Sequence, residues 1–195
     1  MATMRSFWLV AGFAVAFLTL APGAATADNT TETFLLRMGP APNQGAAPNG
    51  DRVLVTCATR GGDCGTFQVH SKKLPLPPAG EFVHTDAAGN ILGAGTWQAT
   101  HLLAYQSYGC GVVTFPDPDV VLPPNLCGGM LKLRVLLTPT GAGFSLPGLL
   151  TVFCIVGPNP PNSHDEPLGE GVTLSIPRVI NFNHTAGGQN IYIMQ

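Results

Sequence analysis

Glycine and proline interrupt this chain at short intervals along almost its whole length. The 195 residues include 24 glycines and 18 prolines. Both residue types favour turns, because glycine tolerates positive φ and proline fixes φ and lacks an N–H donor. Yet 45% of the residues are hydrophobic, an ordinary share for a folded domain and too high for a disordered chain. The composition therefore predicts short strands separated by many turns.

The segments between these turns show the two-residue alternation of half-buried strands. In residues 131–137, leucine and valine alternate with Lys132 and Arg134, so one face is apolar and the other charged. Residues 149–156 are apolar on both faces, which predicts a central strand. Further strand patterns recur at residues 33–38, 51–56, 65–70, 172–176, 179–182 and 191–194. Together they predict an all-β, single-domain antiparallel β-sandwich or β-barrel of about 8–10 short strands.

Two stretches rich in proline are expected to lie outside these strands. Residues 39–50 (GPAPNQGAAPNG) predict a loose segment that does not pack. Residues 74–78 (LPLPP) are expected to break any strand, because proline cannot donate to a sheet ladder.

The predicted fold is organised around residues 81–108. This stretch contains the longest run without glycine or proline outside the N-terminal segment. Gly89 and Asn90 tolerate positive φ and predict a tight hairpin turn. After the turn, the bulky residues fall mainly at odd positions and the polar residues at even positions. This alternation favours a strand over the alternative, a helix across residues 96–107 that contains neither glycine nor proline.

The same alternation places Trp97, His101 and Tyr105 on the inward face of the predicted strand. An imidazole beside two aromatic rings is a candidate ligand-binding group. The alternative interpretation is that His101 is a core histidine whose ring nitrogens are satisfied by neighbouring groups. The three residues are therefore candidate ligand-binding residues.

The N-terminal segment has the three-part layout of a secretory signal peptide. One basic residue, Arg5, precedes an apolar run over residues 7–20, and small residues follow up to Ala27. The run is shorter than the roughly 20 residues that span a bilayer, and no later segment is long and apolar enough for a membrane span. We expect cleavage after Ala27, with an uncleaved anchor as the alternative, leaving residues 28–195 as one secreted all-β domain in the extracellular space.

Five cysteines follow the predicted leader: Cys57, Cys64, Cys110, Cys127 and Cys154. In an oxidising compartment most of them should pair. We expect Cys110–Cys127 to bridge the base of a proline-rich loop. We also expect Cys57–Cys64, in preference to Cys57–Cys154, which leaves Cys154 buried and inert. The alternative for the odd thiol is a bridge between two chains.

The other candidate sites are two glycosylation motifs and two groups of acidic residues. Asn29 and Asn183 each begin an N-x-Thr glycosylation motif. Asp117 and Asp119 lie at alternate positions, and residues 164–166 (HDE) form a second acidic cluster. Oxygen ligands from loops suit Ca²⁺, so Asp117 and Asp119 are candidate metal ligands, and no other cofactor is predicted.

The charge balance and the motifs limit the function classes. Only 10% of residues are charged, with 9 basic and 11 acidic residues and a net charge of −2. Without a basic patch, nucleic acid and anionic membranes are poor partners. The sequence also lacks the GxSxG, HExxH and P-loop motifs, so no catalytic residue is predicted. The oligomeric state is not predicted.

In size, leader, glycosylation motifs and glycine-rich strand edges, the layout resembles the dirigent and allene oxide cyclase type of small β-barrel. No residue matches that family position by position, so the resemblance implies a fold and no site. Our first hypothesis is a secreted, non-catalytic β-domain with an extracellular binding or structural role. The alternative is a calycin- or dirigent-like barrel that binds a small apolar ligand through Trp97, His101 and Tyr105. A third is a small secreted hydrolase that uses Asp117, Asp119 or His101.

Overall fold

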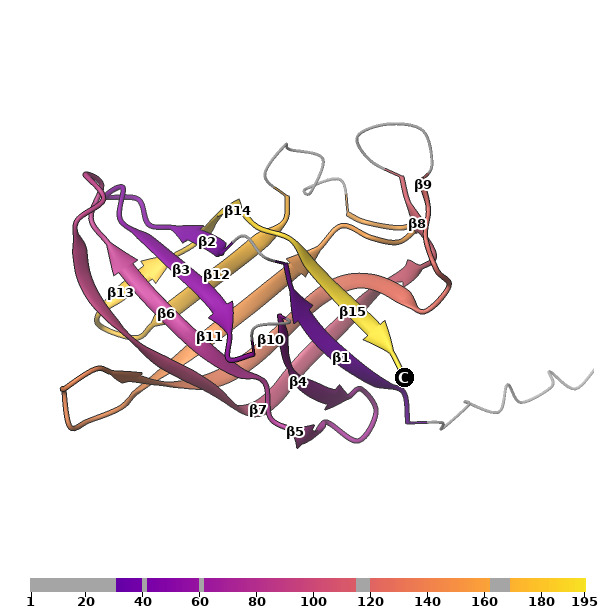
Figure 1. Cartoon of the computed structure of the whole chain (residues 1–195), viewed down its shortest axis with the longest axis horizontal. Coiled ribbons are helices and arrows are strands. Elements are labelled where there is room, and N and C mark those ends of the chain that lie inside the picture. The colour runs from indigo at the N-terminus through magenta and orange to yellow at the C-terminus, as the bar shows by residue number, and fades with distance from the viewer. Residues whose placement is uncertain (1–30, 40–41, 60–61, 115–119, 162–168) are drawn as a thin grey trace, which may run out of the picture.

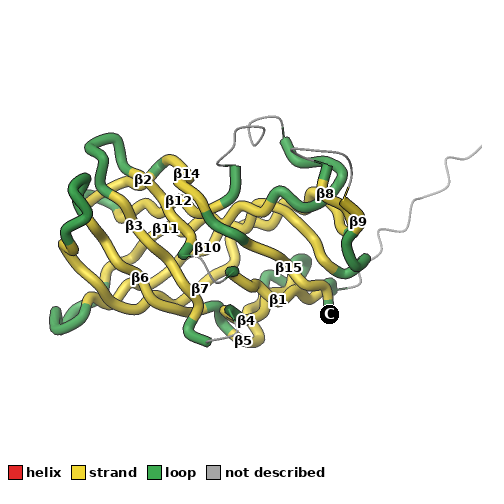
Figure 2. The backbone as a smooth tube through the Cα atoms, turned by 45° about the horizontal axis from the view of Figure 1, so that its top comes forward, coloured by secondary structure: helices red, strands yellow, loops and turns green. Residues whose placement is uncertain are grey.

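The computed structural model describes residues 31–39, 42–59, 62–114, 120–161 and 169–195. The described residues form strands and loops and contain no helix (Figure 2). The strands are β1 (Thr33–Met38), β2 (Asn43–Ala46), β3 (Arg52–Cys57), β4 (Asp63–Gln68), β5 (Lys73–Leu76), β6 (Ala79–Thr85), β7 (Ile91–Cys110), β8 (Val112–Val113), β9 (Val120–Val121), β10 (Leu126–Pro139), β11 (Leu146–Cys154), β12 (Gly171–Ile176), β13 (Ile180–Phe182), β14 (His184–Gly187) and β15 (Asn190–Met194). The predicted all-β class is confirmed.

Several predicted features fall outside the described residues. They are the leader up to Ala27, Asn29, Asp117, Asp119 and the acidic cluster at residues 164–166. The predictions of cleavage, of a sugar at Asn29 and of Ca²⁺ at the two aspartates therefore stay predictions.

Thirteen of the strands build one large curled sheet, a half-barrel, and β8 and β9 pair with each other in a separate two-stranded sheet (Figure 1). Along the curl the strands lie in the order β14-β2-β3-β6-β7-β10-β11-β12-β13, with every neighbouring pair antiparallel. The curl brings β12 against β2 and β14. At this seam the backbones approach so closely that a Cβ on Gly45 would lie 2.8 Å from the carbonyl oxygen of Val172.

A second branch of the sheet leaves β10 near its start. Leu126 and Cys127 pair with β15, whereas later residues of β10 pair with β11. From β15 the branch continues through β1 and β4 to β5. Its interior holds a cluster of aromatic rings with centroids 5.0 to 5.8 Å apart, formed by Phe34, Phe67, Tyr105 and Tyr192.

Two strands are much longer than the sequence patterns predict. β7 spans 20 residues and β10 spans 14, and together they run along most of the molecule and join its two parts (Figure 1). In β10 the predicted alternation is confirmed, because Leu131, Leu133, Val135 and Leu137 are buried while the intervening residues are exposed. Alternation in the sequence therefore predicts where strands lie along the chain, but it does not predict their lengths or their number.

Both predicted breaks in the strand pattern are wrong. Asn43–Ala46 forms β2, which pairs with β3 and β14, and Asn43 is fully buried. Lys73–Leu76 forms β5 although it contains Pro75. Proline is tolerated there because β5 is the last strand of its branch and one of its edges needs no partner.

β7 carries β-bulges where it pairs with β10, and they change which residues face inward. The register shifts after Lys132 and again after Arg134, so β7 has an extra residue at each step. One extra residue reverses the alternation and a second restores it. As a result Trp97 is buried, His101 is exposed opposite Arg134, and Tyr105 faces the interior again. The predicted inward orientation of His101 is therefore wrong.

Both predicted cysteine pairs lie at disulfide distance. The Cα atoms of Cys57 and Cys64 are 4.6 Å apart and those of Cys110 and Cys127 are 3.9 Å apart. The second pair joins register partners of β7 and β10. Cys154 is unpaired and buried, which confirms the expected burial of the odd thiol, and the two expected bridges have the spacing that a disulfide needs.

Candidate ligand-binding cavity

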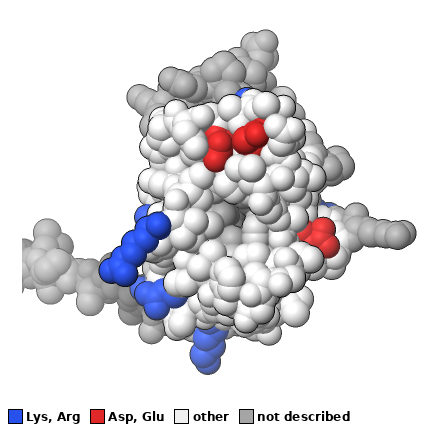
Figure 3. Space-filling model, turned by 90° about the vertical axis from the view of Figure 1, so that its left-hand side faces the viewer, with Lys and Arg blue, Asp and Glu red and all other residues white. Residues whose placement is uncertain are grey.

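A cavity of about 200 Å³ opens at the left-hand end of the half-barrel in Figure 1. It lies among the β6–β7 hairpin, the β10–β11 hairpin and the turn between β12 and β13. In the view onto this end, the surface is mostly uncharged around a central recess (Figure 3). We call this the end cavity, and its wall includes Val53, Phe82, Leu137, Leu174, Ile180 and Phe182. Of the described residues that form the wall, only His84 has a polar side chain.

The end cavity is open because Gly93 has no side chain. Gly93 is the register partner of His84, so both lie on the inner face of the β6–β7 pair. A Cβ built on Gly93 meets no atom within 4 Å. The glycine therefore leaves room beside the imidazole that a larger residue would occupy.

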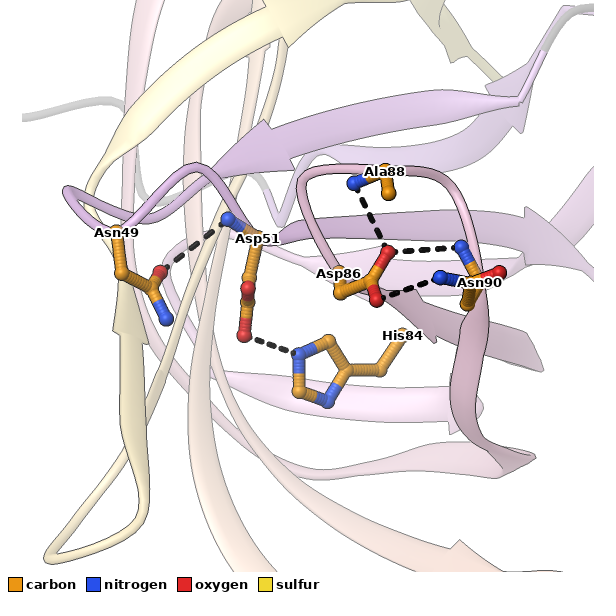
Figure 4. Close-up of polar contacts among 6 residues, drawn as sticks. All are labelled: Asn49, Asp51, His84, Asp86, Ala88 and Asn90. Atoms are coloured by element: carbon orange, nitrogen blue, oxygen red, sulfur yellow. Dashed lines mark hydrogen bonds and ion pairs between the residues drawn. The ribbon is translucent and has the colours of Figure 1, made fainter.

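His84 is held by an ion-pair-like contact with Asp51. The distance from His84 Nε2 to Asp51 Oδ2 is 3.0 Å (Figure 4), and the two side chains are 24% and 13% exposed. The imidazole also packs edge-to-face on Phe182, with centroids 5.2 Å apart and planes at 84°. The ring is thus in contact with a carboxylate on one side and with an aromatic ring on another.

The turn between β2 and β3 positions Asp51. The backbone N–H of Ala47 donates to the carbonyl oxygen of Asp51 at 2.9 Å. The N–H of Asp51 donates to Asn49 Oδ1 at 3.2 Å (Figure 4). β3 pairs with β6 in a register that places Val53 opposite His84. Local turn bonds and strand register together bring the carboxylate to the imidazole.

The neighbouring β6–β7 turn is closed by Asp86. Its carboxylate accepts hydrogen bonds from Ala88 N at 2.9 Å, Asn90 N at 2.8 Å and Asn90 Nδ2 at 2.8 Å (Figure 4). The bond from the Asn90 side chain is the largest cause that lowers the pKa of Asp86, followed by bonds from backbone N–H groups. Gly89 has a φ of 88° in this turn, which confirms the predicted hairpin.

The predicted ligand-binding trio does not meet in the end cavity. None of Trp97, His101 and Tyr105 is among the described residues of its wall. The buried indole of Trp97 donates from Nε1 to the carbonyl oxygen of Thr56 at 3.0 Å. Tyr105 belongs to the aromatic cluster and donates to the carbonyl oxygen of Gly128 at 3.1 Å, and burial raises the pKa of its hydroxyl. The three side chains are separated along the length of β7, and their ligand-binding role stays a prediction.

Sequence reasoning did not identify His84 or Asp51 as site residues. The available signal was the spacing of Phe82 and His84, which lie two positions apart just before a hairpin turn and therefore share a strand face. Asp51 gave no such signal, because its contact with His84 depends on the pairing of β3 with β6.

A second group of buried polar residues lies on and beside β11, β12 and β15. Burial raises the pKa of the Cys154 thiol and of the Glu170 carboxyl, and Glu170 accepts a hydrogen bond from Ile155 N at 3.2 Å. Asn190 Nδ2 donates to the carbonyl oxygens of Phe153 and Gly171, at 2.9 and 3.2 Å. A protonated, buried thiol is a poor nucleophile, so the inertness predicted for Cys154 is consistent with its surroundings and stays a prediction.

Within the described ranges, no group of three or more His, Cys, Asp or Glu residues is arranged to hold a metal ion. The same ranges contain no helix that is long and apolar enough to cross a membrane. Asn183 is exposed between β13 and β14, a position accessible to a sugar, and its glycosylation stays a prediction.

Comparison with protein-family models, curated proteins and solved structures finds no match for this chain.

Proposed function

We propose that this protein is a secreted, non-catalytic binding protein whose end cavity holds a small, largely apolar molecule. The observation that carries the proposal is the open space beside Gly93, enclosed by apolar side chains and by one imidazole. This arrangement has the general form of a ligand site, in which an apolar wall contains a few placed polar groups. Of the earlier hypotheses, it favours the small-ligand alternative.

The size of the end cavity limits the ligand. Drug-sized ligands occupy pockets of roughly 300–1,000 Å³, whereas an engineered apolar cavity of about 150 Å³ binds benzene. A cavity of about 200 Å³ therefore suits a single substituted ring or a short aliphatic chain.

The compartment is part of the proposal. Two cysteine pairs at disulfide distance are compatible with an oxidising, extracellular environment. The leader-like segment up to Ala27 supports the same assignment.

The test is a calorimetric titration of para-xylene into three proteins. Wild type should bind it, and Gly93→Phe should lose the binding because the new ring occupies the end cavity. Ala94→Phe is the matched control, because residue 94 lies next along β7 and its side chain points to the opposite face. The proposal fails if wild type does not bind, or if Gly93→Phe binds as well as Ala94→Phe does.

A further inference from the structure

The His84 ring is the one polar side chain among the described residues of the end cavity, and the position of its ring hydrogen determines whether a ligand must donate or accept a hydrogen bond. The ring comes from β6, lines the cavity beside Gly93, and lies against Phe182. Its Nε2 atom is 3.0 Å from Asp51 Oδ2. The following argument rests on the function proposed above, since it concerns a ligand of the same cavity.

Asp51 selects one tautomer of the imidazole. An ionised carboxylate has no hydrogen to donate and only accepts hydrogen bonds. The nitrogen that contacts it, Nε2, must therefore carry the ring hydrogen. In a neutral imidazole the other nitrogen, Nδ1, is then a hydrogen-bond acceptor.

His84 Nδ1 has no hydrogen-bond partner among the described residues, and it is turned away from Asp51 (Figure 4). An acceptor on an otherwise apolar stretch of wall offers a bound donor a hydrogen bond that an apolar ligand of the same shape cannot make. The group must be a donor, because Nδ1 of this tautomer accepts. It must also be uncharged, because the remaining cavity wall is apolar and would desolvate an ion without compensation.

We propose that the end cavity selects a small alcohol or phenol, whose hydroxyl donates its hydrogen to His84 Nδ1 while the hydrocarbon part fills the space beside Gly93. Asp51 is a positioning residue in this arrangement, because it orients the ring and selects the tautomer without contacting the ligand. The recognition is of one hydroxyl donor attached to an apolar body about the size of one ring.

The experiment compares para-cresol, para-xylene and para-toluate by titration calorimetry at neutral pH. Cresol and xylene have nearly the same shape, but only cresol has a hydroxyl donor, and toluate is an acceptor only. The measured quantity is the ratio of the xylene and cresol dissociation constants in each protein. Comparing this ratio between proteins cancels the different hydration of the two compounds.

In His84→Phe, this ratio should fall about tenfold from its wild-type value, because the variant removes the acceptor that only cresol can use and keeps an aromatic ring against the hydrocarbon part of both compounds. Asp51→Asn should lower the ratio in the same direction, because an amide both donates and accepts and no longer selects the tautomer. This second variant tests the tautomer separately from the packing of the ring.

Three outcomes overturn the inference. If the ratio is unchanged in both variants while Gly93→Phe still abolishes xylene binding, the cavity binds ligands but does not select a hydroxyl. If toluate loses more affinity than cresol in His84→Phe, the ring acts as a donor. If xylene does not bind wild type at all, the proposed function fails and this inference fails with it.

Discussion

His84 and Gly93 face each other across the β6–β7 pair, and they belong to a short series in which a large inward residue always meets a glycine. Phe82 pairs with Gly95 in the same way, and Trp97 pairs with a glycine of β6. At the last two positions, backbone atoms fill the space beside the glycine. Only the His84–Gly93 pair, nearest the end of the half-barrel, leaves that space open. The end cavity exists because, at the last pair of the series, no backbone atom occupies the space beside the glycine.

The two β7 glycines predict opposite effects of the same substitution. Gly93→Ala should keep or raise the free energy of unfolding, by about 0.5–1 kcal/mol, because its Cβ enters open space and its φ is not left-handed. Gly95→Ala should lower it by about 1–3 kcal/mol, because its Cβ would overlap the carbonyl oxygen of Thr138. Urea denaturation of both variants measures the difference. Equal effects would contradict the described contacts of β7.

Trp97 and His101 both lie on β7. Substitutions at these two positions test the orientation that the bulges give to each side chain. Trp97→Ala should lower the free energy of unfolding by about 3–5 kcal/mol, because the buried indole packs in the core and donates to Thr56. His101→Ala should change it by less than about 0.5 kcal/mol, because the imidazole is exposed. Thermal and urea unfolding report both values. A large loss in His101→Ala would mean that the ring points inward after all.

Asn43 and Asn190 predict how buried amides contribute to stability. Asn190→Ala should cost about 1–3 kcal/mol, because it removes the side chain that donates to the carbonyl oxygens of Phe153 and Gly171. Asn43→Val should be neutral or stabilising, because neither polar atom of Asn43 has a partner among the described residues. Chemical denaturation separates the two outcomes. A loss in Asn43→Val as large as that in Asn190→Ala would indicate an ordered water that satisfies Asn43.

Glu170 predicts a pH dependence of stability. Burial raises the pKa of its carboxyl above the ordinary value of 4.5, so the folded state binds the proton more tightly than the unfolded state. Stability from this group is fully present below the unfolded pKa and is lost as the pH rises through the folded pKa. Glu170→Gln should flatten this part of the profile. The check is the urea midpoint of both proteins between about pH 4 and pH 8, and an unchanged slope in Glu170→Gln would contradict the prediction.

The class of fold was predictable because part of the chain alternates cleanly in polarity. In β10, Lys132 and Arg134 separate buried leucines and valine, so periodicity alone gives both the strand and its buried face. β2 was not predictable, because Asn43–Ala46 contains no large apolar residue and is placed by its pairing with β3 and β14. The bulges that turn His101 outward likewise leave no mark in local sequence.

The candidate site was less predictable than the fold. Asp51 and His84 are 33 positions apart and meet only because β3 pairs with β6. The open space beside Gly93 depends on what the distant β10–β11 and β12–β13 connections leave unfilled. Both features are products of long-range pairing, for which a single sequence has no local pattern.

The central claim is that the end cavity beside Gly93 holds a small apolar molecule, and a crystal of the protein soaked in para-iodotoluene tests it most directly. Iodine scatters anomalously, so its position is found independently of the atomic interpretation. The account predicts one dominant iodine peak inside the cavity, close to His84 and Phe182, and no such peak in Gly93→Phe. Iodine found only between molecules or on the outer surface, with the cavity free of it in wild type, would contradict the account.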